Sequence, residues 1–330
     1  MTKHLSVPFI LLFCTSMLQA STGGDPSKPI RVFILAGQSN MEGTGFVEAD
    51  PKRNEGRGSL EYLVRNSSTA EKFGHLKDAN NKWVIRDDVF ISYLDRKGPL
   101  TVGFGAKQDR IGPELGFGCV VGDKIDDPVV LIKCAWGGKS LAVDFRPPGA
   151  GPLPYSLGEK GDAELEADPD IVGHYYRDTL ARTRIALQNL HEFIPDARER
   201  GYVIAGFGWH QGWNDRIHDR HNAEYESNMV QFIRDIRHDL GVNKLPFVIA
   251  ETGMTGPDET HPRAISLMKA QAAAASQSEF EGNVALVRTR EFWRPKDQSP
   301  TGQGYHWNTN AETYYLIGEA MGHAMLKLME

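Results

Sequence analysis

The sequence predicts an α/β protein in which a five-stranded parallel sheet is sandwiched between helices. Five short apolar runs recur along the chain, and five amphipathic helical segments lie among them. The first run, IRVFILA at residues 30–36, is rich in β-branched residues and carries a single charge, as a strand covered on both faces should. Strands that alternate with helices in this way are typical of a parallel sheet between helical layers.

The expected elements follow one another in order along the chain. The strands are the apolar runs at residues 30–36, 128–134, 202–207, 245–250 and 283–287. The helices are expected at residues 113–125, 172–190, 223–240, 262–276 and 310–328. The last of these helices begins with Asn310 as a plausible N-cap and carries an apolar stripe formed by Tyr314, Ile317, Met321, Met325 and Leu328.

Two segments interrupt the alternation. Residues 51–112 contain short strand-like pieces among Gly, Asn and Lys, and residues 144–170 are rich in Pro, Gly and acidic residues. We expect both to be long insertions that emerge from the ends of the sheet, where long loops often carry function. No internal repeat or low-complexity linker divides the chain, so we expect a single domain over residues 21–330.

The first twenty residues have the pattern of a secretory signal peptide. Lys3 and His4 precede a mostly apolar run at residues 7–18, and Ala20 is a small residue that suits cleavage. A buried N-terminal helix is the alternative. We expect cleavage after Ala20 and a secreted or periplasmic protein. No later stretch reaches the roughly 18 to 20 apolar residues of a membrane span.

The charge balance and the cysteines narrow the possible partners. The chain has 37 Lys and Arg against 43 Asp and Glu, a net charge of −6, and it has no long basic run. Binding to nucleic acid or to an anionic membrane is therefore not expected. Outside the signal peptide, Cys119 and Cys134 either pair in an oxidising compartment or stay as buried thiols. No CxxC spacing indicates a metal site.

A serine follows the first strand in the motif GQSN at residues 37–40. Because ligands bind at the carboxyl ends of parallel strands, Ser39 can face the mouth of the sheet. A helix that begins there would add free N–H groups, which stabilise a developing oxyanion. An ordinary turn is the alternative explanation of this motif.

Two further motifs follow strands and offer oxyanion donors. The adjacent glycines of AWGGKS at residues 135–140 let a backbone N–H approach a ligand closely. In WHQGWND at residues 209–215, the side-chain amide of Asn214 is a good donor and Gly212 gives the loop freedom. Trp209 and Trp213 are either core residues or platforms for a sugar ring.

Histidines stand in two of these regions. His210, His218 and His221 suggest a metal, but no positioned carboxylate or Cys accompanies them, so we expect no metal site. His306, in GYHWN just before the last helix, lies in a loop from which it can reach a nucleophile and act as a general base. A lone loop histidine is usually without function, but four motifs gathered at strand ends favour a catalytic site.

The order Ser, Gly, Asn, His resembles the four sequence blocks of the SGNH hydrolases. Within that superfamily, FILAGQSNMEG, GGKSL, WHQGWND and HWNTNAETYYLIGEAM are similar to the sialate O-acetylesterase and acetylxylan esterase branch, carbohydrate esterase family 6. These motifs span residues 30–328. The resemblance implies a flavodoxin-like, three-layer α/β/α fold, no metal or other cofactor, and hydrolysis of acetyl esters on carbohydrates.

The resemblance also implies roles for individual residues. Ser39 would be the nucleophile and His306 the general base. The backbone N–H groups of Ser39 and Gly138 (or Gly137), together with the Asn214 side chain, would form the oxyanion hole. The residues expected to line the substrate site are Gln38, Gln211, Trp136, Trp213 and Trp307.

One position departs from the superfamily pattern. Gln303 stands three residues before His306, where the superfamily has Asp. A neutral amide cannot supply the charge with which a triad carboxylate orients and stabilises the imidazole. Asp297 is the favoured substitute, since the QSPTGQG loop could bring it round, while Glu291 and Glu251 are less favoured. A Ser–His dyad with a backbone carbonyl orienting the ring is the other possibility.

Two other functional hypotheses remain open. A sugar-binding protein on an inactive esterase scaffold is favoured by Gln303 and by the tryptophans near the expected site, whereas the intact Ser, Gly, Asn and His set favours an enzyme. A lipid or thioester substrate is less expected, because no long apolar stretch remains to line an acyl channel.

Overall fold

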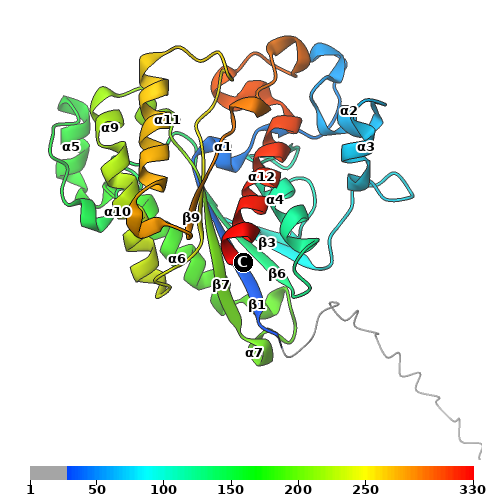
Figure 1. Ribbon diagram of the computed structural model, residues 1–330, viewed down its shortest axis with the longest axis horizontal. Helices are drawn as coiled ribbons and strands as arrows, with labels where there is room; N and C mark the ends of the chain where they lie inside the picture. The colour runs from blue at the N-terminus through cyan, green and yellow to red at the C-terminus, as the bar shows by residue number, and fades with distance from the viewer. Residues whose placement is uncertain (1–27) are drawn as a thin grey trace, which may run out of the picture.

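The computed structural model describes residues 28–330, in which helices pack on both faces of a central sheet (Figure 1). The expected signal peptide and its cleavage site lie outside the described residues. Within residues 28–330, none of the helices is both long enough and apolar enough to cross a bilayer.

Seven strands form the main sheet, in the order β4-β3-β6-β1-β7-β8-β9. Every neighbouring pair is parallel except β3 and β4, which are antiparallel. The five predicted runs are all strands: β1 (Ile30–Gly37), β6 (Val129–Ala135), β7 (Tyr202–His210), β8 (Phe247–Ala250) and β9 (Val284–Val287). The predicted α/β class and the arrangement of one sheet between helices are therefore confirmed.

The prediction of five strands is wrong, because the insertion at residues 51–112 adds two more. β3 (Val89–Tyr93) pairs in parallel with β6, and β4 (Arg96–Pro99) folds back beside it. The run VFISY of β3 is apolar and mostly buried, so it extends the sheet from the edge of β6. β4 has the sequence RKGP, and a short charged strand of this kind ends a sheet without inviting further pairing.

Side chains of β1 alternate between two cores, one on each face of the sheet. Phe33 and Leu35 join the core under α4 (Pro113–Gly122) and α12 (Ala311–Met329). Val32 and Ile34 join the core on the other face, under α6 (His174–Gln188), α10 (Tyr225–Leu240) and α11 (Pro262–Ala275). This explains why the β1 sequence is apolar throughout, since both faces of the strand are covered.

All five predicted helices are present. Besides α4 and α12 they are α6 (His174–Gln188), α10 (Tyr225–Leu240) and α11 (Pro262–Ala275). Asn310 caps α12 as expected, since its side chain accepts a hydrogen bond from the Thr313 N–H. Shorter helices are α1 (Ser39–Glu42), α2 (Leu60–Arg65), α3 (Ala70–Phe73), α5 (Glu159–Ala167), α7 (Ala197–Arg200), α8 (Trp213–Arg216) and α9 (Asp219–Ala223).

The remaining elements are short and lie mainly in the insertions and in the segment before α12. The strands β2 (Gly45–Phe46) and β5 (Arg110–Ile111) pair as a small separate sheet. The 3-10 turns are η1 (Asn54–Gly56), η2 (Gly74–Leu76), η3 (Pro148–Ala150), η4 (Pro169–Ile171), η5 (Leu190–Glu192), η6 (Ser278–Phe280), η7 (Arg290–Phe292), η8 (Lys296–Gln298) and η9 (Gly304–Thr309).

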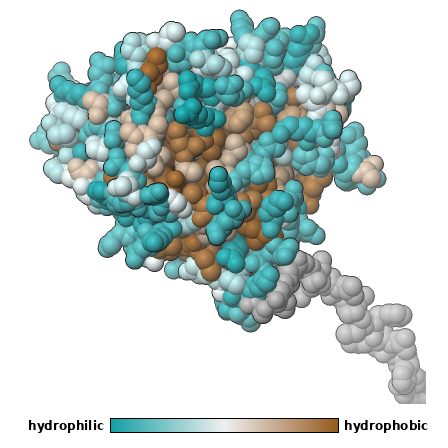
Figure 2. Space-filling model, in the orientation of Figure 1, coloured by the Kyte–Doolittle hydropathy of each residue, from teal (hydrophilic) through white to brown (hydrophobic). Residues whose placement is uncertain are grey.

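Apolar residues gather on one face of the molecule, and the two cysteines of the described residues are unpaired. On the face shown in Figure 2, apolar residues gather over the middle, between α11 and α12, with polar residues around them. The edge strand β9 has two half-buried apolar residues there, Ala285 and Leu286. Cys119 and Cys134 are both buried and form no disulfide bond. Of the two alternatives, the structure therefore agrees with buried free thiols.

Candidate active site

Ser39 lies at the centre of the sheet, where the chain leaves β1 and enters α1. β1 stands between β6 and β7, so the loops after these three strands meet at one edge. Gly37 has a φ of +154°, and a Cβ at this position would lie 2.2 Å from the carbonyl oxygen of His210. Only glycine lets β1 and β7 approach so closely just before the serine.

Ser39 and His306 form a hydrogen bond between Oγ and Nε2 at 3.0 Å. Ser39 is 9% exposed, and His306 is half-buried in η9. Burial lowers the pKa of the His306 imidazole below its ordinary value. The neutral ring is the form that can accept the serine proton, so the two side chains are arranged as a nucleophile and its base.

The segment after His306 has an unusual backbone. Trp307, Asn308 and Thr309 all have positive φ values, between 52° and 56°. Such conformations are costly for residues other than glycine and persist where surrounding contacts enforce them. The Trp307 side chain is fully buried, and the Asn308 amide donates to the carbonyl of Arg294 at 3.0 Å. These contacts hold the chain directly after His306.

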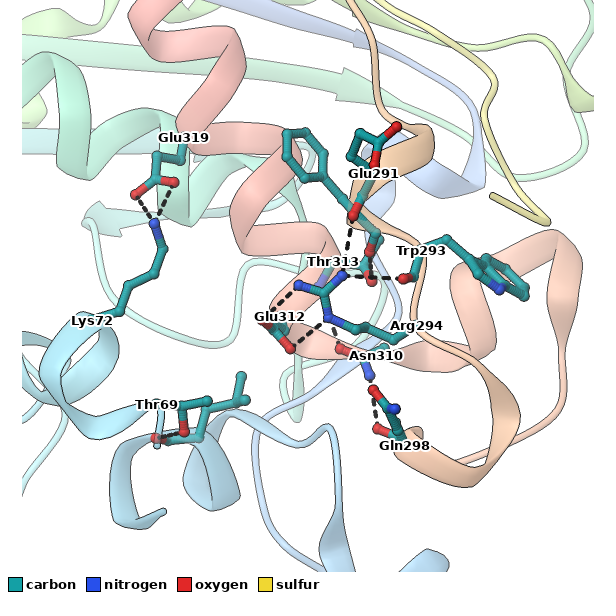
Figure 3. A network of polar contacts seen from close by, with 12 residues as sticks. Thr69, Lys72, Glu291, Trp293, Arg294, Gln298, Asn310, Glu312, Thr313 and Glu319 are labelled. Carbon is teal, nitrogen blue, oxygen red and sulfur yellow. Dashed lines mark hydrogen bonds and ion pairs between the residues drawn. The ribbon is translucent and has the colours of Figure 1, made fainter. Parts of the chain in front are cut away.

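A network of hydrogen bonds and ion pairs joins the segment before α12, from residue 290 onward, to the start of that helix (Figure 3). The Arg294 guanidinium donates to both carboxylate oxygens of Glu312, at 2.8 and 2.9 Å, and also to the backbone carbonyl of Glu291. Asn310 donates to the carbonyl of Gln298 at 3.1 Å. The loop that carries His306 is therefore fixed at several points along its length.

A second link joins the histidine loop directly to the serine helix. The Asn40 amide donates to the carbonyl of Tyr305 at 3.0 Å. The Tyr314 hydroxyl lies 2.8 Å from Asn40 Oδ1 and 3.2 Å from the carbonyl oxygen of His306. No local sequence pattern indicates Asn40 and Tyr314 as positioning residues: Asn40 lies within the GQSN motif, and Tyr314 belongs to the apolar stripe of α12.

The expected oxyanion donors come together beside Ser39. Gly138 has a φ of +70° and is exposed. The backbone N–H groups of Ser39 and Gly138 have no hydrogen-bond partner within residues 28–330. The Asn214 amide donates to the carbonyl of Gly138 at 2.6 Å, which leaves its second N–H proton for another acceptor.

Two residues expected to line the substrate site are instead buried beneath it. Gln38 is 2% exposed, and its Oε1 accepts from the backbone N–H of Gly212 and Asn214 and from the Gln211 amide. Gln211 is 1% exposed, and its amide also donates to Asp215. Both side chains are therefore buried, and their amides position the Asn214 loop, while a contact of either with substrate stays a prediction.

Asp215 links the loop that carries Gly138 to the loop that carries Asn214. It is 0% exposed, and its two carboxylate oxygens accept from the backbone N–H groups of Leu141 and Ala142 at 2.8 and 2.9 Å. Burial raises the pKa of Asp215 to about 7, although these N–H donors and Gln211 act in the opposite direction. Asp215 thus ties the loop after β6 to the loop after β7.

The predicted tryptophans have different surroundings. Trp213 is half-buried, and its ring centroid lies 5.7 Å from that of Tyr305, beside the site. Trp136 packs on Phe145 and Tyr175, on the face of the sheet that α6, α10 and α11 cover. Trp307 is 0% exposed, and its left-handed backbone directs its ring into the core, so its contact with substrate stays an untested prediction. Trp209 is likewise fully buried.

None of the candidate acids contacts the His306 ring. Asp297 is exposed, and its backbone carbonyl accepts a hydrogen bond from the Asn54 amide. Glu251 is buried against Arg290 and Thr289, and the Glu291 side chain is exposed. Gln303 is also exposed. In the described part of the chain, the imidazole thus has a hydrogen bond to Ser39 but none to a carboxylate.

The other histidines do not form a metal centre. His210 is buried, with Nδ1 3.3 Å from the carbonyl oxygen of Ala250, and burial lowers its pKa to about 4. His218 and His221 face each other, with ring centroids 4.7 Å apart. Among residues 28–330, no three His, Cys, Asp or Glu side chains are grouped so that they could hold a metal ion.

The geometry suits acyl transfer. A serine hydroxyl touches a half-buried imidazole, and unpaired backbone N–H groups and an amide lie beside it. This is the constellation that attacks an ester carbonyl and stabilises the resulting oxyanion.

Comparison with known proteins agrees with this chemistry. Residues 29–327 match a family model described as "Carbohydrate esterase, sialic acid-specific acetylesterase". A protein of Arabidopsis thaliana named probable carbohydrate esterase At4g34215 is 27% identical over 228 residues, which cover 68% of this chain and 69% of that protein.

Solved structures share the fold at low sequence identity. The At4g34215 structure has a TM-score of 0.54 at 20% identity, over 90% of this chain and 98% of that chain. NanS has a TM-score of 0.50 at 14% identity, over 84% and 85% of the two chains. XAC1771, a carbohydrate acetylesterase from Xanthomonas citri, has a TM-score of 0.50 at 13% identity, over 89% of this chain and 55% of that chain.

Proposed function

The chain belongs to the carbohydrate esterase family of sialic acid-specific acetylesterases, and from this we propose that it is a serine esterase that removes acetyl groups from carbohydrates through an acetyl-enzyme. The observation that carries the proposal is the 3.0 Å hydrogen bond between Ser39 Oγ and His306 Nε2. The family membership agrees with the branch that the four sequence motifs resemble.

The proposed mechanism begins with proton transfer from Ser39 to His306 as the serine oxygen attacks the acetyl carbonyl. The N–H groups of Ser39 and Gly138 and the free amide proton of Asn214 hold the oxyanion. His306 then gives its proton to the departing sugar oxygen, which leaves an acetyl ester on Ser39. A water molecule activated by His306 attacks this ester, releases acetate and restores the serine.

Several finer features of the proposal are supported by sequence motifs. The four blocks support a flavodoxin-like SGNH fold, and the pattern of the first twenty residues supports a secreted or periplasmic protein. Acetylated xylan and O-acetylated sialic acid are both candidate substrates. We propose no metal or cofactor, since the reaction needs only the groups named above.

An inactive sugar-binding protein is the competing function. The lack of a carboxylate at His306 favours it, because the charge that stabilises an imidazolium is missing. The direct contact between Ser39 and His306 and the free N–H groups beside it favour the enzyme, since a binding protein has no need for either.

Acetate release from a panel of esters tests the proposal. Acetylated xylan, O-acetylated sialic acid and p-nitrophenyl acetate would be compared with p-nitrophenyl octanoate. We expect release of acetate from at least one of the acetylated carbohydrates and slow hydrolysis of the octanoate. Sugar binding without release of acetate from any ester would instead establish the binding protein. Faster hydrolysis of the octanoate would indicate a lipid esterase.

Replacement of Gln303 tests whether the missing charge limits the reaction. Burial alone lowers the pKa of His306, so the wild-type rate is expected to fall only below about pH 6.5, the ordinary imidazole value. The backbone carbonyl of Gln303 accepts from the backbone N–H of His306 at 2.8 Å, so position 303 lies one turn before the histidine. We expect Gln303→Asp to raise that midpoint by about one pH unit and kcat by about tenfold.

The matched control is Gln303→Asn, which has the shape of the aspartate variant without its charge. It is expected to leave the pH midpoint where the wild type has it. An unchanged midpoint in Gln303→Asp would mean that position 303 does not control the charge near His306.

A further inference from the structure

Tyr305 has an exposed aromatic ring directly beside the proposed general base. Its ring centroid lies 4.5 Å from that of His306, and the residue is 42% exposed. Its hydroxyl makes no hydrogen bond within the described residues. The exposed part of the Tyr305 side chain and its hydroxyl are therefore free to meet a ligand.

The Tyr305 ring packs against a stack of side chains from α8. The Trp213 ring lies 5.7 Å from the Tyr305 ring, and the Arg216 guanidinium lies 4.5 Å from the Trp213 centroid. Arg216 is in turn 3.6 Å from the carboxylate of Glu259. Arg216 thus packs on the indole, and the exposed end of the stack is Tyr305.

The backbone of Tyr305 is fixed independently of its side chain. Its carbonyl accepts from the Asn40 amide at 3.0 Å, and Asn40 also contacts the Tyr314 hydroxyl. A substitution of the Tyr305 side chain therefore leaves the anchors of the His306 loop in place.

The proposed reaction constrains where the sugar ring must lie. To receive a proton, the departing sugar oxygen must come within about 3 Å of His306 Nε2. In an acetylated ring hydroxyl, such as those of xylose, that oxygen is bonded to the sugar ring directly, so the ring must lie next to the imidazole. Tyr305 is the exposed aromatic residue beside the imidazole, and aromatic rings stack on the apolar C–H faces of sugars.

We propose that Tyr305, braced by Trp213 and Arg216, is the platform on which the pyranose ring of the acetylated substrate stacks during hydrolysis. This inference rests on the proposed function, and it adds a substrate-binding residue that the sequence motifs did not indicate. Its neighbour Trp213 supports Tyr305 more than it contacts the sugar.

A binding measurement in the Ser39→Ala background tests the platform without any need for turnover. The probes are methyl β-xylopyranoside triacetate and O-acetylated N-acetylneuraminic acid, titrated by calorimetry. We expect Tyr305→Ala to weaken the Kd of at least one probe about tenfold, and Tyr305→Phe to keep most of the affinity because the ring is retained. Tyr202→Ala is the matched control, since Tyr202 is 46% exposed at the opposite end of β7.

Equal affinities of the Ser39→Ala protein and the Ser39→Ala/Tyr305→Ala protein for both probes would overturn the proposal. Failure of both probes to bind would overturn it as well. The wild-type rate on ethyl acetate, which has no ring, reports separately on the esterase chemistry. Hydrolysis of ethyl acetate together with equal sugar affinities would therefore reject the platform and keep the proposed function.

Discussion

Replacing His306 by alanine is expected to lower kcat/KM for p-nitrophenyl acetate by about a thousandfold, within the range that general acid–base catalysis contributes. A serine hydroxyl is a weak nucleophile unless a base takes its proton, and His306 Nε2 is the group that contacts Ser39 Oγ. The same residue must protonate the leaving oxygen and activate water, so its loss affects both halves of the reaction.

Two controls separate this loss from damage to the fold. His191→Ala removes an exposed histidine in η5, near the start of β7 and away from Ser39, and it should keep the wild-type rate. Imidazole added to the His306→Ala protein should restore part of the activity. A loss smaller than about tenfold would mean that another group takes the serine proton.

The elements of the sheet and of the site were predictable where local sequence decides them. A strand buried on both faces must be apolar throughout, so β1 and the other four predicted strands could be recognised one by one. Because parallel strands end at the same edge, the motifs of Ser39, Gly138 and Asn214 could be expected together. Their meeting beside His306 follows from the position of the loop before α12.

Other features depend on contacts between distant residues. β3 lies within an insertion that is otherwise rich in polar residues and turns, and only its pairing with β6 makes it part of the sheet. Asn40 and Tyr314 are 274 positions apart, so no local pattern could reveal that they link the serine helix to the histidine loop.

Side-chain direction in loops is the feature that local sequence indicates least. Gln38 and Trp307 each stand next to a proposed catalytic residue, which made both candidates for substrate contact. The left-handed backbone at Trp307 and the hydrogen bonds of Gln38 direct these side chains inward. Tyr305, the other neighbour of His306, is the one whose ring is exposed.

The absence of a carboxylate at His306 shapes the expected kinetics. In triads, the acid orients the imidazole and stabilises its charged form. Here Asn40 and Tyr314 hold the backbone around the ring, which can orient it but cannot supply the charge. We therefore expect a Ser–His dyad that is slower than a full triad and remains active at mildly acidic pH, because burial lowers the pKa of His306.

The most direct test of the central claim is acetate release by the wild-type protein and by Ser39→Ala, from p-nitrophenyl acetate and acetylated xylan. Ser276→Ala, at the exposed end of α11, is the matched control, and thermal melting confirms that each variant is folded. We predict that Ser39→Ala loses at least about a thousandfold in kcat, as removal of a catalytic nucleophile does, while Ser276→Ala keeps the wild-type rate. Equal rates in the wild type and Ser39→Ala, or no release by either, would contradict the assignment of Ser39 as nucleophile.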